Sequence, residues 1–316
     1  MTKSRFINLS VTTLSAVFFL LSLTLTTSAQ PLLHTCSQAN NGGPFVHIIN
    51  QNTAETLSST EITLEGVDVN GCTGMSKDPT TGVCWIVLAT PNTAGDDNPG
   101  PRILATIDTD TGIATQVGNL GDSFAGLAFD SGGTLYGVTG DGANLPSRIF
   151  TINKSTAAPT FFLDLGTDGD SEDGEAIGFN PLDGLMYHVS GNGEINIETI
   201  FESVNLASKN IDRITLMGNL SEYDENTALV YQGNNVLLAA QRSENALHSI
   251  TTNGLVSFIG FMDHRAKGLA FDCGTPGFPS EFTAIPTLSE WGLIITVAAL
   301  GLISFFALRR RSAAQG

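Results

Sequence analysis

The sequence is poor in basic residues, with 14 Lys and Arg against 31 Asp and Glu in a chain of 316 residues. Proteins that follow the phosphates of nucleic acids need a basic surface to displace counterions. A net charge of −17 and a pI near 4.4 therefore exclude nucleic acid as a partner. Charged residues make up 14% of the chain and apolar residues 41%, a balance that also excludes a mainly disordered acidic protein.

The sequence also lacks familiar catalytic signatures. It contains no GxSxG elbow, no HExxH helix, no Walker loop and no dinucleotide fingerprint, so we assign no catalytic residues. The five histidines are scattered along the chain, and a single histidine in a strand is more often packed or half-exposed than a ligand. The cysteines have no CxxC spacing, which disfavours a zinc site.

Long apolar runs occur only at the two ends of the sequence. Near the N-terminus, Lys3 and Arg5 precede the twelve apolar or small residues of Leu14–Leu25, and small residues follow up to Gln30. This order predicts a signal peptide over residues 1–29 that is removed by signal peptidase. An N-terminal membrane anchor is the alternative, but the run is short for a span of ~20 residues.

The second apolar run lies near the C-terminus. Trp291–Leu308 contains eighteen residues without a charge, and three arginines follow at once in Arg309–Arg311. We predict a transmembrane helix over residues 291–308 and a basic cytoplasmic tail over residues 309–316, because arginines flank spans on the cytoplasmic side. The region between the two apolar runs then lies outside the cytoplasm.

A short motif precedes this second run, within a linker over residues 281–290. Its residues are Ile285, Pro286, Thr287, Leu288, Ser289, Glu290, Trp291 and Gly292. The order of motif, apolar helix and arginines resembles the IPTL-CTERM protein-sorting domain, which is related in layout to PEP-CTERM and LPXTG tails. The resemblance implies an exported envelope protein of a Gram-negative bacterium. It also implies recognition by a membrane transpeptidase of the exosortase type, which cuts near the motif and passes the ectodomain to the cell surface.

The acidity belongs to the part between the two ends. Residues 30–284 hold nine of the basic residues and 30 of the acidic ones, a net charge of −21. Such a surface disfavours anionic partners and favours cations, bound specifically or as a diffuse cloud.

A five-residue pattern repeats within the predicted ectodomain, residues 30–280. The sequence GLAFD occurs twice and weaker copies occur three times, at Gly74–Asp78, Gly126–Asp130, Ala176–Asn180, Ala228–Gln232 and Gly268–Asp272. The starts are 52, 50, 52 and 40 residues apart. A period of ~40–50 residues with this β-forming composition indicates a propeller or another repeat array.

Each repeat shows the same internal order. The GLAFD-like strand is followed by a turn, a second apolar strand such as Leu135–Thr139, a third such as Arg148–Asn153 and a fourth such as Ala114–Gly118. Four short antiparallel strands in each period are typical of a propeller blade.

The ends of the array predict how it closes. Phe45–Asn50 and Glu61–Glu65 resemble the last two strands of a blade, and Gly268–Asp272 resembles an inner strand without a continuation. Pairing them builds a hybrid blade and removes exposed sheet edges. We therefore predict an all-β, five-bladed propeller with four complete blades between Gly74 and Lys267. A pair of β-sandwiches is the alternative.

Four cysteines, Cys36, Cys72, Cys84 and Cys273, fit an exported protein because disulfides persist in oxidising compartments. Three connectivities are open. We favour Cys36 with Cys273, which locks the hybrid blade, and Cys72 with Cys84, which staples the first hairpin.

One acidic loop is a candidate for Ca²⁺. Its carboxylates include Asp168, Asp170, Asp173 and Glu175, and alternating carboxylates can surround a hard cation. The loop does not follow the EF-hand frame, since Asp173 and Phe179 stand where that frame needs glycine and glutamate. A solvated acidic turn is the alternative.

The repeats predict a second candidate site. Four positions before each GLAFD-like start stand Asn70, Asp122, Glu172, Asp224 and His264. In a propeller these loops lead into the inner strands and surround one mouth of the channel, so the five residues form our candidate ring for a cation or ligand.

Two functional classes remain. The first is a non-enzymatic surface protein that binds an extracellular protein or glycan in adhesion or in a matrix. The second is an extracytoplasmic, metal-assisted hydrolase or lyase that uses the channel carboxylates, because a fold does not determine function. Metal content of the purified protein discriminates between them.

Overall fold

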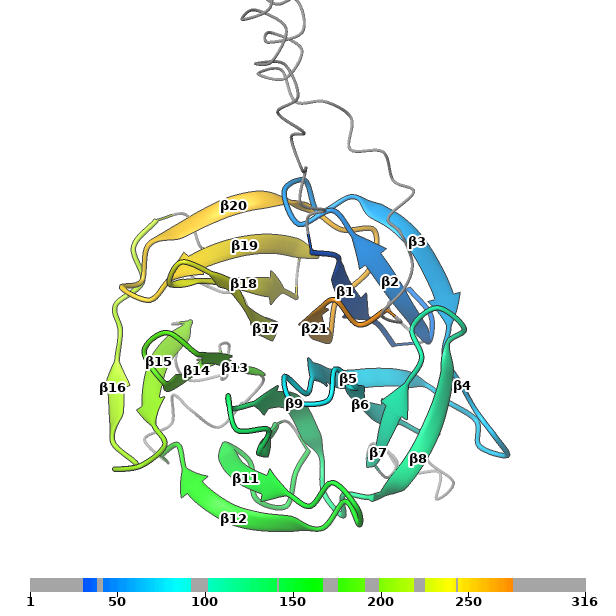
Figure 1. The fold of residues 1–316 in the computed structure, drawn as a ribbon. Coiled ribbons are helices and arrows are strands. Elements are labelled where there is room, and N and C mark those ends of the chain that lie inside the picture. The colour runs from blue at the N-terminus through cyan, green and yellow to red at the C-terminus, as the bar shows by residue number, and fades with distance from the viewer. Residues whose placement is uncertain are drawn as a thin grey trace, which may run out of the picture. The chain divides into compact units, whose positions relative to one another are not determined.

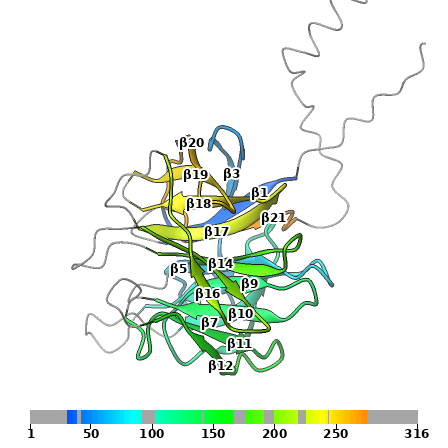
Figure 2. The ribbon, with the colours of Figure 1, turned by 90° about the vertical axis from the view of Figure 1, so that its left-hand side faces the viewer.

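The computed structural model describes residues 31–38, 42–91, 102–140, 142–166, 176–190, 199–218, 225–242 and 244–274. These residues form five β-sheets arranged in a ring around a central axis, a five-bladed β-propeller (Figure 1). Figure 2 shows the same ring from the side, with β16 and the strands of the β17–β20 sheet toward the viewer. The predicted propeller is confirmed, and the alternative of two sandwiches is wrong.

Four blades follow one another along the chain, each with its first strand innermost. Blade 1 contains β5 (Gly71–Lys77), β6 (Cys84–Ala89), β7 (Arg102–Ile107) and β8 (Ile113–Asn119). Blade 2 contains β9 (Phe124–Phe129), β10 (Leu135–Thr139), β11 (Arg148–Ile152) and β12 (Pro159–Asp164). Blade 3 contains β13 (Ala176–Asn180), β14 (Leu185–Ser190), β15 (Ile200–Asn205) and β16 (Ile211–Arg213). Blade 4 contains β17 (Asn226–Gly233), β18 (Val236–Gln241), β19 (Ala246–Thr251) and β20 (Val256–Phe261).

The fifth, hybrid blade closes the ring with strands from both ends of the described chain. Its order from the axis outward is β21 (Gly268–Phe271), β1 (Leu33–Cys36), β2 (Phe45–Ile49) and β3 (Thr56–Glu61). Antiparallel pairing sets Leu33 opposite Phe271 and Cys36 opposite Gly268. The predicted hybrid blade is therefore confirmed.

Two details of the hybrid blade differ from the prediction. Its outer strand is β3 rather than residues 61–65, of which Thr63–Leu64 (β4) instead pairs in parallel with β8 at the edge of blade 1. Its second strand, β1, was not predicted. The strand β3 is polar and largely exposed, whereas Ile62 and Leu64 are apolar because they pack into the interface with blade 1.

The inner strands β5, β9, β13, β17 and β21 each contact the next around the axis, so that the ring is continuous. The first residue of each GLAFD-like motif is small in all five repeats: Gly74, Gly126, Ala176, Ala228 and Gly268. A Cβ atom on Gly74 would lie 3.0 Å from the Cα of Gly126. Small residues are needed here because the inner strands approach one another backbone to backbone.

The last residue of the motif ends the inner strand in the same way in several blades. A side-chain oxygen of Asp78, Asp130 or Asn180 accepts a hydrogen bond from the backbone N–H two residues later, at 2.9 Å in each case. These are Asx turns, which reverse the chain into the second strand of the blade.

The hydrophobic core consists of five clusters, one at each interface between neighbouring blades in the described part of the chain. Side chains alternate along each strand and so face both neighbouring blades. Burial of apolar area between blades is the main stabilising contribution, at ~25 cal/mol per Å². The cluster between the hybrid blade and blade 1 contains all four cysteines.

All four cysteines form disulfides, as expected, but the favoured connectivity is wrong. The bonds join Cys36 to Cys72 and Cys84 to Cys273, with Cα separations of 5.9 and 5.5 Å. In the hairpin of blade 1, Cys84 lies opposite Lys77, far along the ladder from Cys72. Cys36 lies opposite Gly268, equally far from Cys273. Both disulfides therefore bridge the hybrid blade to blade 1.

Candidate functional site

One cavity among the described residues lies on the central axis and is lined by all five inner strands. Its volume is about 230 Å³. It opens where the inner strands end, and we call this opening the C-terminal mouth. Pro79, Asp130, Ser131 and Pro181, which follow inner strands, form its rim. A cavity that converges from all repeats on the axis is the first place to expect a ligand in such a fold.

The other end of the channel is a constriction. Around the small first residues of the motifs the free volume falls to about 10 Å³, and the lining includes Gly74, Gly126, Ala176 and Gly268. This volume is close to the minimum for one water molecule. The cavity, which we call the mouth cavity, is therefore a cup with a closed floor.

The walls of the mouth cavity come from equivalent positions in the repeats. The fourth residue of the motif is aromatic in four repeats and lysine in one: Lys77, Phe129, Phe179, Tyr231 and Phe271. Phe271, Tyr231 and Phe179 also pack against the clusters between blades, which hold their rings in place. The cup thus has a rigid aromatic wall and one ammonium group.

The two charged groups in the lining differ in what they bind. Within the described residues, the ammonium of Lys77 makes no hydrogen bond or ion pair. Asp130, in contrast, accepts backbone hydrogen bonds from Gly132 and Thr134, at 2.9 and 2.8 Å. Burial raises the pKa of Tyr136, and its hydroxyl also bonds the carboxylate of Asp130. Of the two charged groups, the cation is therefore the one that is available to a ligand.

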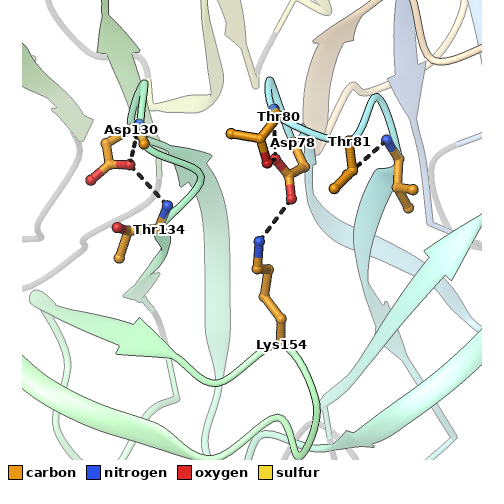
Figure 3. A network of polar contacts seen from close by, with 8 residues as sticks. Asp78, Thr80, Thr81, Asp130, Thr134 and Lys154 are labelled. Atoms are coloured by element: carbon orange, nitrogen blue, oxygen red, sulfur yellow. Dashed lines mark hydrogen bonds and ion pairs between the residues drawn. The ribbon is translucent and has the colours of Figure 1, made fainter.

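Beside the cavity, an ion pair joins blades 1 and 2. Figure 3 shows Lys154, from the turn after β11, reaching the carboxylate of Asp78 at the end of β5, at 2.8 Å. Thr80 donates both its N–H and its hydroxyl to the same carboxylate. Burial alone would raise the pKa of Asp78, but these bonds outweigh it and lower the pKa to about 2. The pair keeps this rim of the cavity fixed.

Equivalent polar contacts join other blades at the same level. Asn180 donates to Asn235 of blade 4 at 3.2 Å, and Gln232 donates to Gln51 of the hybrid blade at 2.8 Å. In each case the contact starts from the fifth residue of the motif. These residues serve the architecture of the C-terminal mouth rather than ligand binding.

The predicted ring of ligand candidates belongs to the opposite, N-terminal mouth. Asn70, Asp122 and His264 lie in loops that lead into β5, β9 and β21, as expected, while Glu172 and Asp224 lie outside the described residues. One oxygen of Asp122 accepts hydrogen bonds from the backbone N–H groups of Ser123 and Asn144, at 2.9 and 2.8 Å. The ring stays a prediction.

His264 takes part in a buried network within the hybrid blade. Its imidazole stacks on that of His47, with ring centroids 3.6 Å apart. Its Nδ1 lies 2.9 Å from Asp263 and its Nε2 lies 2.6 Å from the hydroxyl of Thr35. Because a carboxylate only accepts, Nδ1 carries the proton and Thr35 donates to Nε2.

This Asp–His–hydroxyl order is the order of a catalytic triad. However, Thr35 is 0% exposed and lies in β1, inside the hybrid blade, so no substrate carbonyl reaches its hydroxyl. The network therefore holds the blade together and offers no nucleophile. The five histidines of the chain are all buried: His34, His47, His188, His248 and His264.

Other predicted features lie outside the described residues. These are the acidic loop with Asp168, Asp170, Asp173 and Glu175, the signal peptide, the motif from Ile285 to Gly292 and the helix over residues 291–308. Among the residues that are described, no group of three or more His, Cys, Asp or Glu side chains could hold a metal ion. Within the same residues, no helix has the length and apolar character needed to cross a membrane.

Sequence reasoning did not find the mouth cavity. The residues before each motif are polar because they lie in loops, whereas the residues that line the cavity stand within the motif. Aligning the fourth positions reveals the signal, four aromatic residues and a single lysine.

Comparison with known protein families identifies the C-terminal segment of the chain. Residues 283–311 match the model of the IPTL-CTERM motif, which confirms the resemblance. No curated protein sequence matches the chain.

Solved structures show a likeness of fold. A chain of a nidogen/laminin complex is similar with a TM-score of 0.50 and 11% identity, over 78% of this chain and 100% of that chain. A protein of unknown function from Bacteroides caccae has a TM-score of 0.49 and 12% identity, over 77% and 99% of the two chains. The Malassezia sympodialis allergen Mala s 1 has a TM-score of 0.47 and 14% identity, over 76% and 74%. Identities this low carry no function across.

The chain thus combines a five-bladed, disulfide-closed propeller with a C-terminal IPTL-CTERM motif. That motif indicates an exported protein of the cell surface.

Proposed function

We propose that the protein is a non-enzymatic binding module that is exported, sorted through its IPTL motif and displayed on the bacterial cell surface. The observation that carries the proposal is the match of residues 283–311 to a sorting motif, in a chain whose described residues form a closed propeller. A sorting tail directs a protein to a location and has no reaction of its own, so the activity belongs to the propeller.

Two features of the propeller support binding rather than catalysis. Its two disulfides suit an oxidising compartment and hold the closing blade to blade 1. Its one triad-like arrangement among the described residues ends in a hydroxyl that is buried at Thr35. A rigid scaffold with an aromatic cup is suited to hold a partner without transforming it.

The sorting step is tested by locating the protein and sequencing its mature C-terminus by mass spectrometry, in a host that has an exosortase. We expect the native chain at the cell surface with a C-terminus near the motif. A Pro286→Ala variant should keep residues 309–316 and remain in the membrane fraction, because Pro286 keeps the scissile segment extended. The matched control is Pro279→Ala, outside the motif, which should be processed normally.

The sorting role is overturned by a native chain that retains Gly316 and stays in the cytoplasm. It is also overturned by a Pro286→Ala variant that is processed as fast as the control. The binding role is overturned by a stoichiometric metal with an open coordination position in the purified protein, which would favour the metal-assisted hydrolase or lyase instead.

A further inference from the structure

The mouth cavity contains one feature that its packing does not require, the ammonium of Lys77. The four equivalent positions carry aromatic rings that fill the space between blades, and a fifth ring would extend the same wall. Lys77 is instead a half-buried cation in an apolar lining, without a hydrogen-bond partner among the described residues. The net charge of residues 30–284 disfavours anions at long range, but within the cavity the ammonium against apolar walls favours a ligand of the opposite charge.

Among the described residues, no carboxylate forms an ion pair with the ammonium of Lys77. Asp130 is the carboxylate in the lining, and Gly132, Thr134 and Tyr136 already bond to it. The second nearby cation, Lys154, is paired with Asp78. Among the described lining residues, Lys77 is therefore the charged side chain without a hydrogen bond or ion pair.

We propose that the mouth cavity binds a small aromatic carboxylate, with its carboxylate on Lys77 and its ring against Phe179, Tyr231 and Phe271. This inference rests on the proposed binding role and names the ligand class. Aromatic rings prefer edge-to-face or offset contact with other rings, which a wall of three aromatic side chains can provide. A charge-assisted hydrogen bond to an ammonium is about twice as strong as a neutral one.

The size of the cavity limits the ligand. About 230 Å³ corresponds to several waters at ~30 Å³ each in the liquid, so there is room for one ring with a short polar group. The constriction beneath, at about 10 Å³, stops a ligand from passing through the channel. A polymer could enter only by its end, and a single-ring acid fits the cup whole.

The probe for this site is benzoate, titrated calorimetrically into the full chain in phosphatidylcholine nanodiscs at pH 7.5, with empty nanodiscs as the blank. Benzamide, which has the same shape without the charge, and acetate, which has the charge without the ring, are the matched probes. We expect saturable binding of one benzoate per chain, at least about ten-fold weaker binding of benzamide, and no binding of acetate.

Substitutions of Lys77 test the role of its charge separately from the stability of the fold. Lys77→Gln should weaken benzoate about ten-fold or more and leave benzamide unchanged, because only the charge-assisted bond is lost. Lys77→Arg keeps the charge and should bind benzoate nearly as the native chain does. Lys209→Gln is the control, since Lys209 donates to the carbonyl of Phe162 at 2.7 Å and does not line the cavity.

The inference is overturned if the native chain does not bind benzoate, if benzamide binds equally well, or if Lys77→Gln and Lys209→Gln have the same effect. Failure of Lys77→Arg to bind would also overturn it, provided that its circular dichroism is native. None of these results bears on surface location or processing of the tail, so a failure here is distinguishable from a failure of the proposed function.

Discussion

The stacked histidines of the hybrid blade predict a strong dependence of stability on pH. His47 is 4% exposed and its imidazole lies on that of His264. Its Nε2 bonds to Ser37, whose own hydroxyl donates to the carbonyl of Gly43, and its Nδ1 bonds to Ser59. The ring therefore donates through Nε2 and accepts at Nδ1, as a neutral imidazole.

Burial, and next the neighbouring His264, lower the pKa of His47 from 6.5 to about 3. Burial also lowers the pKa values of His264 and His34, although Asp263 partly opposes this for His264. A lowered pKa in the folded state means that the unfolded chain binds more protons below pH 6.5. The stabilisation is thus complete above that pH and is lost as the pH falls toward 3.

The magnitude follows from the two pKa values of His47. At pH 5 the unfolded histidine is almost fully protonated and the folded one is neutral, so between pH 8 and pH 5 the free energy of unfolding falls by about 2 kcal/mol. His264 and His34 add to the fall in the same direction. The lowered pKa values of Asp78 and Asp263 act only in more acidic solution, below about 3.8.

The assay is equilibrium urea unfolding of residues 31–278, followed by the fluorescence of the buried Trp85, at pH 8, 6.5 and 5. In a His47→Gln variant the fall between pH 8 and pH 5 should shrink by about 2 kcal/mol, because one titrating group is gone. The control Ser59→Ala removes a hydrogen bond of His47 and keeps the titration, so it should be less stable at every pH with the native fall. Equal stability of the native protein at pH 8 and pH 5, or an undiminished fall in His47→Gln, would refute the reasoning.

Three further expectations follow from single contacts. Replacing Cys84 and Cys273 by serine should lower stability by up to about 5 kcal/mol, since that bond spans 189 residues; an unchanged melting temperature would contradict this. Gly268→Ala should cost about 1–3 kcal/mol in urea unfolding, because its Cβ would lie 2.7 Å from a backbone nitrogen of blade 1, and no loss would show that the inner strands can separate. Lys154→Met should raise the pKa of the Asp78 carboxyl from about 2, measured by NMR titration, and an unmoved pKa would assign the shift to Thr80 alone.

Much of the fold could be predicted because the blades of a propeller repeat one sequence pattern. Gly or Ala opens each copy of the motif, and Asp or Asn closes four of the five copies, so Gly126–Asp130 identifies the other four. The closing blade was predictable for a related reason. A sheet with unpaired edges is unfavourable, and unmatched strands at the two ends of an array must find each other.

The remaining features depend on contacts between blades, which spacing along the chain does not encode. Cys36 and Cys72 stand on neighbouring blades, and no pattern within either repeat indicates that their side chains meet. The strand β3 escaped detection because its side chains are mostly exposed and polar, so its sequence carries no apolar alternation. The short strand β1 contains His34 and Thr35, which are buried through specific partners rather than through apolar character.

Both ends of the described chain lie at the C-terminal mouth, beside the mouth cavity. Leu33 pairs with Phe271, and the N–H of Leu32 donates to Asp272 at 3.0 Å, so the described chain begins and ends at the C-terminal mouth. The bond between Cys273 and Cys84 fixes the last described residues there, because Cys84 lies opposite Lys77. The last described residues therefore lie at the mouth that carries the cavity, held to the turn region of blade 1.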